Sequence, residues 1–378
     1  MIQMKKLSTG ISNFKEIIEN DYIYVDKTKT ICELIDDNFT CMLVKPKGFG
    51  KSLLISTMKE IFEGNKELFK GLYIYDKWDW TKKYNVIHLD FKKINYETPE
   101  KLKQSLYDFL VKVADKYGII LRGTLLNSNF SSLLSDIHRK TDKKVVVLID
   151  GYDKPTIDSI ENIELAKEIL SDLFSFFTVL KASGKHLKFV FLTGVTKSFQ
   201  TSIFSGFNNV IDLTTHYTYP TICGFTQDEF KSYYSEYINK FSKDKNIERG
   251  KLIDLINQWY GGYSWNGNDF LINPKSAFSA ISTAKFDNYW FENSKTPFLI
   301  DIIKNNQKEV EELIQNKQSY VTGINNLEIE RIDVYQFLLH NGYLSLKKKK
   351  RAKSLQTYYE VYIPNREVKK SLNEIITI

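Results

Sequence analysis

The residues with the clearest chemical potential are Gly50, Lys51 and Ser52, which lie in the stretch KPKGFGKSL. In the phosphate-binding pattern G-x-x-x-x-G-K-[ST], the lysine reaches the β- and γ-phosphates and the serine or threonine hydroxyl binds Mg²⁺. Backbone N–H groups at the start of the following helix surround the phosphate oxygens. Lys45 occupies the position of the first glycine of this pattern. The tripeptide alone would also fit a turn that simply opens a helix.

The flanking residues favour phosphate binding. An apolar run at residues 41–44 precedes the loop, and apolar residues at helical spacing follow it from residue 53 to residue 62. A strand, a glycine-bearing loop and a helix in this order form a site for a triphosphate. We therefore expect ATP to be bound by Lys45, Lys47, Gly48, Phe49, Gly50, Lys51, Ser52 and Leu53.

A second acidic element lies in VVVLIDGYDKP, where a buried strand would end at Asp150. Doubly wound sheets place their ligands at the carboxyl ends of strands, so Ser52 and Asp150 are the expected Mg²⁺ ligands, Asp150 through water. In most hydrolysing P-loop proteins a glutamate that polarises water follows this aspartate, whereas the next residue here is Gly151. Asp153 is either a substitute base or a turn residue.

Thr193 lies near the C-terminal end of the next predicted strand, FVFLTGV, which would lie beside the strands that end before the loop and at Asp150. This position predicts that Thr193 senses the γ-phosphate, so it joins Asp150 and Asp153 as a candidate catalytic residue. A threonine and a glycine at a strand end also occur for purely local reasons.

Apolar runs predict buried strands at residues 41–44, 85–91, 143–150 and 186–195, with a fifth strand at 209–214. Continuous apolar runs suit strands covered on both faces, and helices between them imply a parallel sheet. The expected fold is α/β, with a P-loop NTPase core over residues 1–222 and a helical, winged-helix-like region over residues 223–378. We expect helices at 26–37, 100–117, 161–181, 226–242, 249–259, 296–316 and 331–340.

Composition bounds the class of protein. The chain has 378 residues, of which 42% are hydrophobic and 26% charged, with a formal net charge of +7. These values are ordinary for a globular protein and exclude the disordered classes. The three cysteines form no zinc or disulfide pattern, and the sequence shows neither an apolar signal segment nor a membrane-spanning run. We expect a cytoplasmic protein without a membrane partner.

The basic and aromatic clusters do not decide which kind of partner the protein binds. KKKKRAK, at residues 347–353, either binds the phosphates of a nucleic acid or is the solvated tip of a hairpin. The aromatic stretches WYGGYSW and NYWFENS either stack on bases or pack between helices. Glu367-Val368-Lys369 fits an E-x-K nuclease signature by letter only. The C-terminal region is the expected contact for a protein or nucleic-acid partner, and oligomerisation is left open.

Taken in order, these elements closely resemble the bacterial predicted AAA-ATPase-like family over nearly the whole chain. The resemblance is carried by YIYVDKTKTICELI (22–35), KPKGFGKSL (45–53), FEGNKELFKGLYI (62–74), VIHLDF (86–91), VVLIDGYDKP (146–155), FLTGVTKSFQTSIFSGFNNVIDLT (191–214), CGFTQDEF (223–230), WYGGYSW (259–265), NYWFENS (288–294), HNGYLSL (340–346) and IPNREV (363–368). It implies a P-loop ATPase core with a helical, winged-helix-like extension. Members often carry a C-terminal PD-(D/E)XK-type nuclease domain, which would commonly begin where this sequence stops, at Ile378.

The sequence departs from the family pattern at the loop and after Asp150. Family loops are arginine-rich, whereas Lys45, Lys47 and Gly48 fill those positions here, and lysine cannot make a bidentate contact to phosphate. Gly151 replaces the family's glutamate. Two hypotheses follow. The protein is either a slow Mg²⁺-dependent ATPase that moves its C-terminal region, or a hydrolysis-deficient module whose bound nucleotide prepares it for a protein or nucleic-acid partner.

Overall fold

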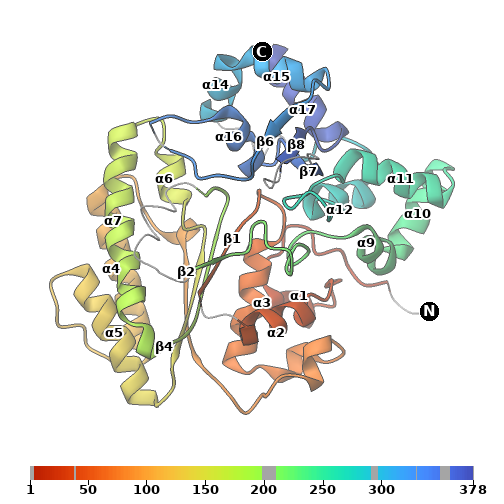
Figure 1. Cartoon of the computed structure of the whole chain (residues 1–378). Coiled ribbons are helices and arrows are strands. Elements are labelled where there is room, and N and C mark those ends of the chain that lie inside the picture. The colour runs from red at the N-terminus through yellow and green to blue at the C-terminus, as the bar shows by residue number, and fades with distance from the viewer. Residues whose placement is uncertain are drawn as a thin grey trace.

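A parallel sheet lies at the centre of the molecule (Figure 1). The structure is a computed structural model that describes residues 4–37, 40–197, 210–290, 297–328, 330–349 and 358–377. The sheet contains β1 (Thr40–Val44), β2 (Asn85–Asp90), β3 (Val145–Asp150), β4 (Leu187–Gly194) and β5 (Ile211–Asp212), in the order β2-β3-β4-β1-β5. Every neighbouring pair in this sheet is parallel. The predicted α/β fold and its strands are confirmed.

The strand order decides which residues share the carboxyl edge of the sheet. β4 lies between β1 and β3, and Thr193 of β4 is in register with both Leu43 and Asp150. β2 pairs with β3 so that Asp90 is opposite Asp150. The loop after β1 and the ends of β2, β3 and β4 therefore meet at the edge where doubly wound sheets bind their ligands.

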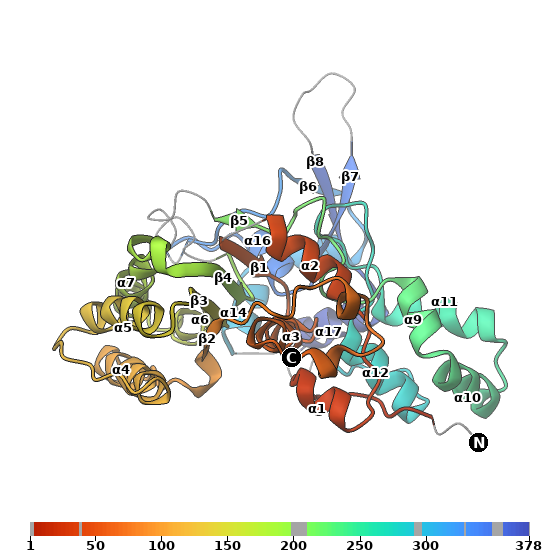
Figure 2. The ribbon, with the colours of Figure 1, turned by 90° about the horizontal axis from the view of Figure 1, so that it is seen from below.

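Helices cover both faces of the sheet. On one face lies α3 (Lys51–Glu63), and on the other lie α4 (Pro99–Lys116), α5 (Leu126–Thr141) and α7 (Ile163–Ala182) (Figure 2). Successive strand residues point to opposite faces, so Leu148 of β3 belongs to the core with α3 while Val147 belongs to the core with α5 and α7. Burial on both faces explains why the strands read as continuous apolar runs.

Shorter elements complete this part of the chain. They are α1 (Phe14–Glu19), α2 (Thr28–Asp37), α6 (Lys154–Asp158) and the 3₁₀ turns η1 (Lys66–Phe69), η2 (Tyr73–Asp76), η3 (Phe91–Lys93) and η4 (Gly184–His186). α2 confirms the predicted helix at 26–37, and its first turn is fixed by Asp26, whose Oδ1 accepts the N–H of Thr28 at 2.8 Å. α4 and α7 also lie where the sequence predicts them.

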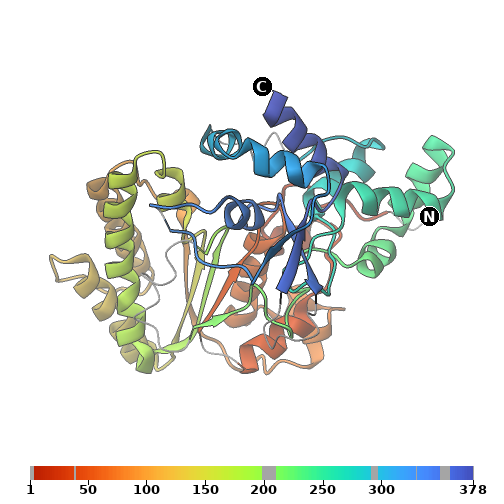
Figure 3. The same ribbon diagram turned by 45° about the horizontal axis from the view of Figure 1, so that its top comes forward.

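The rest of the chain is a helical array with a small antiparallel sheet, on the side of the carboxyl edge (Figure 3). Its helices are α9 (Gln227–Tyr233), α10 (Ser235–Lys245), α11 (Arg249–Tyr260), α12 (Pro274–Thr283), α14 (Pro297–Asn305), α15 (Gln307–Ile314), α16 (Val334–His340) and α17 (Arg366–Thr377). The predicted hairpin of β7 (Ser345–Lys349) and β8 (Tyr358–Tyr362) gains a third strand, β6 (Ser319–Val321), in the order β6-β8-β7. Most of the basic run at 347–353 lies outside the described residues.

The C-terminal array shares a hydrophobic core with the sheet part. Phe49 of the loop after β1 makes edge-on contacts with Tyr263 and Trp265, at centroid distances of 5.0 and 5.1 Å. Lys27 forms an ion pair of 2.6 Å with Glu229 of α9. The predicted division at residue 222 stays a prediction, but residues on its two sides are packed together. In the described ranges, no helix combines the length and apolar character needed to cross a bilayer.

Candidate functional site

The loop between β1 and α3 has the geometry of a phosphate cradle. Gly48 and Gly50 have φ angles of 83° and 91°, which glycine adopts without strain. Gly50 precedes α3 and has no side chain, so no side-chain cap occupies the N–H groups of the first turn. These amides and the dipole of α3 favour an anion at this point. Lys45 is not among the residues with positive φ, so its position does not require the pattern's first glycine.

Lys51 begins α3 and turns back across the loop. Its ammonium group donates hydrogen bonds to the carbonyl oxygens of Lys45 at 2.7 Å and Pro46 at 2.9 Å. Burial lowers the pKa of Lys51 to about 8, against the opposing effect of the Asp150 carboxylate. The side chain is therefore mostly charged at neutral pH, inside the loop that would surround a phosphate.

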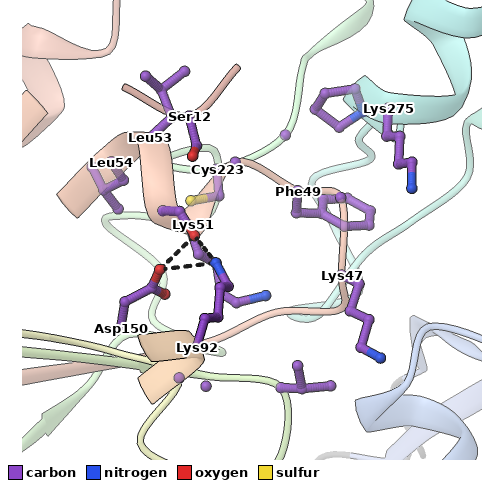
Figure 4. Close-up of a pocket in the computed structure, with 18 of the residues that line it drawn as sticks. Ser12, Lys47, Phe49, Lys51, Leu53, Leu54, Lys92, Asp150, Cys223 and Lys275 are labelled. Atoms are coloured by element: carbon purple, nitrogen blue, oxygen red, sulfur yellow. Dashed lines mark hydrogen bonds and ion pairs between the residues drawn. The ribbon is translucent and has the colours of Figure 1, made fainter. Parts of the chain in front are cut away.

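Ser52, Asp150 and Lys92 make a three-way contact at the carboxyl edge of the sheet. Figure 4 shows Asp150 and Lys92 directed toward each other. Ser52 Oγ donates to Asp150 Oδ2 at 2.5 Å, and Lys92 Nζ lies 2.7 Å from Ser52 Oγ and 3.1 Å from Asp150 Oδ2. Thr193 Oγ1 donates to the second carboxylate oxygen, Oδ1, at 2.9 Å. Burial alone would raise the pKa of Asp150, but Lys92 and the two hydroxyl groups outweigh it and hold the pKa below its usual range.

The two predicted metal ligands, Ser52 and Asp150, lie together although they are far apart in the sequence. Their donor atoms are a hydroxyl and a carboxylate oxygen, the kind of ligand that Mg²⁺ prefers. A cation, the Lys92 ammonium, already contacts both oxygens. This donor set fits Mg²⁺, which when bound would add positive charge beside the phosphates.

Lys92 is a site residue that the sequence pattern did not predict. It follows β2 in the turn η3, where Asp90 Oδ1 accepts its N–H at 3.0 Å. Because β2 is in register with β3, this turn lies beside the end of β3. The available signal was a lysine two residues after the strand-end aspartate in VIHLDFK, but nothing local in the sequence reveals which strand neighbours β2.

The structure gives Thr193 and Asp153 supporting positions. The Thr193 hydroxyl is fully buried and orients Asp150, and Thr193 does not line the pocket. Asp153 lines the pocket, but its Oδ2 accepts the N–H groups of Val195 and Thr196 at 2.9 and 2.7 Å and the Thr196 hydroxyl at 2.9 Å. Burial raises the pKa of Asp153 against these hydrogen bonds. The geometry is that of a residue holding the loop after β4.

Lys45 requires a correction, because its side chain does not face the phosphate loop. It is 1% exposed, its Nζ donates to the carbonyl of Thr214 at 3.2 Å, and it lies 3.8 Å from the ring centroid of Trp265. Only its backbone carbonyl takes part in the loop, as an acceptor for Lys51. Burial lowers the pKa of Lys45 to about 7. A lysine in the first loop position thus packs the loop against the C-terminal array.

The other predicted binding residues line one pocket of about 780 Å³ over the loop. The predicted residues in this lining are Lys47, Gly48, Phe49, Gly50, Lys51, Ser52, Leu53, Asp150 and Asp153. Apolar residues of the same lining come from the N-terminal segment and the C-terminal array: Ile23, Val25, Phe225, Tyr234 and Phe278. The volume lies within the range of small-molecule sites.

The site combines a parallel sheet and a glycine loop with a lysine and a serine at one helix N-terminus and an aspartate at the end of a nearby strand. Together these features define a P-loop protein of the ATPase class. A family model described as "Predicted AAA-ATPase" matches residues 8–204, which contain the loop, Lys92, Asp150 and Thr193. A protein of Azotobacter chroococcum mcd 1, described as "Uncharacterized protein in vnfD 5'region", is 32% identical over 375 residues, 99% of this chain and 70% of that protein. The chain belongs to the predicted AAA-ATPase family.

Among solved structures, a chain from "Structure of Drosophila ORC bound to AT-rich DNA and Cdc6" aligns with 96% of this chain and 91% of its own length. The identity is 10% and the TM-score 0.25, a score too low for this likeness to carry an argument.

Replacing Lys45 by methionine should stabilise the protein, mainly at neutral pH and below. The folded chain holds this proton with a pKa of about 7, whereas an unfolded lysine holds it with a pKa of about 10.4. Between these values the unfolded chain binds more protons, so the stability of the wild type rises with pH. Lys45→Met should therefore raise the free energy of unfolding by about 1–3 kcal/mol at pH 7 and by less at pH 9.

Urea unfolding at the two pH values measures this difference. Lys47→Met is the matched control, because Lys47 is the exposed lysine of the same loop and its replacement should change stability little. A loss of stability in Lys45→Met at pH 7 would mean that the contact with the Trp265 ring outweighs the cost of burying the charge.

Replacing Asp153 by alanine should destabilise the fold, whether or not Asp153 takes part in catalysis. Two backbone N–H groups and one hydroxyl would lose their acceptor, at a cost of about 2–4 kcal/mol. Asp158→Ala is the control, because Asp158 lines the same pocket but its pair with Lys154 is partly exposed. Chemical denaturation without nucleotide distinguishes the two variants. Equal stabilities would return Asp153 to the role of a candidate base.

Proposed function

We propose that this protein binds ATP with Mg²⁺ at the loop after β1, hydrolyses it slowly and links the nucleotide state to the position of its C-terminal array. The observation that carries the proposal is the convergence of Lys51, Ser52 and Asp150 at the N-terminus of α3, within one pocket of about 780 Å³. Family membership supports nucleotide binding in general, and the finer statements are supported by the contacts described below.

The phosphate-binding step uses groups that are already in place. The carbonyl oxygens of Lys45 and Pro46 now accept the hydrogen bonds of the Lys51 ammonium group. Phosphate oxygens are stronger acceptors because they are charged, so Lys51 would turn to them while the amides of the first turn of α3 bind the same group. The apolar part of the lining, with Ile23, Val25 and Phe278, suits a flat base, which is stabilised by burial.

The turn after Asp150 favours slow hydrolysis. Gly151 has a φ of 75°, in the left-handed region, and its N–H and that of Tyr152 donate to the carbonyl of Thr193 at 2.8 and 3.0 Å. The turn therefore has no side chain at the position where the family resemblance implies a glutamate. Asp153 is engaged with the loop after β4. Water in the pocket would thus be activated weakly, by groups other than the usual base.

Coupling to the C-terminal array is supported by direct contacts of the loop. The Phe49 carbonyl accepts the N–H of Gly224 at 3.0 Å, and the Phe49 ring packs on Tyr263 and Trp265. Gly48 is so close to α12 that an added Cβ would lie 3.1 Å from the Cβ of Lys275. A change in the loop on phosphate binding would therefore be transmitted to the array, since packed elements do not deform independently.

The second candidate is a module that binds ATP without hydrolysing it. The positive φ of Gly151 and the hydrogen bonds of Asp153 favour this reading equally. In both versions the C-terminal array is the proposed contact for a protein or nucleic-acid partner, with Lys347 and Lys348 exposed on β7. The three cysteines are free thiols, which supports the proposed cytoplasmic location. Oligomerisation is compatible with either version.

Lys51→Ala should abolish tight nucleotide binding. The variant loses a charged hydrogen-bond donor to the phosphates, worth about 1.5–3 kcal/mol, so the Kd for Mg²⁺·ATP should rise at least tenfold. Isothermal titration calorimetry measures the change. Lys59→Ala removes the same charge from the same helix, further from the loop, and should bind as the wild type does. Equal binding by wild type and Lys51→Ala would reject the loop as the phosphate site.

The wild-type rate of phosphate release separates the two candidate functions, and Gly151→Glu tests the missing base that both of them assume. If the wild type lacks a base, the added carboxylate should increase phosphate release at least tenfold, whereas Gly151→Gln should not. Both variants force a side chain into positive φ and should lose about 1–2 kcal/mol of stability equally. Wild-type phosphate release that Lys51→Ala abolishes would support the ATPase and exclude the non-hydrolysing module, whereas release by Gly151→Glu alone would support the module.

A further inference from the structure

The Lys92 ammonium occupies the place between the two predicted metal ligands. It is the only member of the three-way contact with a largely exposed side chain: 55% for Lys92 against 5% for Asp150. Its backbone is held by the hydrogen bond to Asp90 and by the neighbouring Phe91, which is fully buried. The side chain is therefore free to leave, while the turn that carries it is fixed.

The buried Asp150 carboxylate requires a positive partner. An ionised group at this depth is costly unless it is paired, and hydroxyl groups alone do not supply charge. Thr193 takes Oδ1, and Ser52 and Lys92 take Oδ2. Lys51 is directed at the loop carbonyls instead. Among these contacts, only the one with Lys92 brings a cation to the carboxylate.

A divalent ion and the Lys92 ammonium cannot contact the same two oxygens together. Lys92 uses the lone pairs of Ser52 Oγ and Asp150 Oδ2, which a metal would need directly at Ser52 and directly or through a bound water at Asp150, and like charges at this distance repel strongly. One must leave when the other binds. Lys92 also lines the pocket with Lys51, so in the absence of metal its charge lies beside the region where the phosphates would bind.

We propose that Lys92 is a tethered cation that holds the Mg²⁺ position until the metal arrives and then gives up its contacts with Ser52 and Asp150. The proposal rests on the proposed function and adds a property of this site to it. In the absence of Mg²⁺, the Lys92 ammonium supplies positive charge that lets nucleotide bind without metal. In the presence of Mg²⁺, Lys92 competes with the metal and weakens the affinity of the site for it. Removing Lys92 should therefore make nucleotide binding more dependent on Mg²⁺.

The test compares the Kd of a fluorescent ATP analogue in EDTA with its Kd in saturating Mg²⁺. The ratio of the two values should be at least about fivefold larger in Lys92→Gln than in the wild type, because a part-exposed charged contact is lost only in the metal-free complex. Lys92→Arg keeps the charge and should restore the wild-type ratio. Lys93→Gln is the matched control, since Lys93 is 80% exposed and 3.9 Å from Asp90.

A second readout needs no metal-free nucleotide complex. Mn²⁺ binding in the presence of a non-hydrolysable ATP analogue, followed by electron paramagnetic resonance, should be several-fold tighter in Lys92→Gln and unchanged in Lys93→Gln. If Lys92→Gln leaves the Kd ratio unchanged, or weakens binding by the same factor in both conditions, Lys92 is not a metal competitor while ATP binding stands. If the wild type binds no nucleotide in either condition, the proposed function and this inference both fail.

Discussion

The structure depends on one electrostatic constraint: a carboxylate, that of Asp150, is buried at the end of a strand enclosed on both faces. Such a group is stable only when its lone pairs and its charge are satisfied. The strand order supplies the partners, because β4 places Thr193 on one side of β3 and β2 places the turn with Lys92 on the other. The P-loop serine completes the set from α3. The arrangement that satisfies this carboxylate is also the arrangement that would hold a metal beside a triphosphate.

A second constraint joins the phosphate loop to the rest of the molecule. Gly48 and Gly50 let the loop turn sharply, but the residue between them, Phe49, is buried against two aromatic rings of the C-terminal array. Lys45 adds a cation over one of these rings, that of Trp265. The loop is therefore held by the C-terminal array, and its conformation is part of the packing of the array.

Much of the fold could be predicted from the sequence, because strands buried on both faces leave long apolar runs. The pattern around Gly50-Lys51-Ser52 and the apolar strand that ends at Asp150 likewise identified groups that the structure brings into one pocket. α5 was missed because its sequence, LNSNFSSLLSDIHRKT, is rich in serine and asparagine, which compete for backbone hydrogen bonds. It is helical because Phe130, Leu133 and Ile137 reach the core, an example of tertiary packing overriding local propensity.

The two differences between expectation and structure at the site, the buried side chain of Lys45 and the contact made by Lys92, both concern where a lysine side chain points. A sequence shows a charge near a phosphate loop but not the direction of its side chain or its depth. Lys45 and Lys51 both meet that description, yet the first is buried over an indole ring and the second crosses the loop. Lys92 does not meet it, yet it reaches the site from another strand. Burial lowers the pKa of Lys45 and Lys51 to about 7 and about 8. Of the three, only the exposed Lys92 can move freely, so the lysine furthest from the motif is the one suited to exchange with a metal.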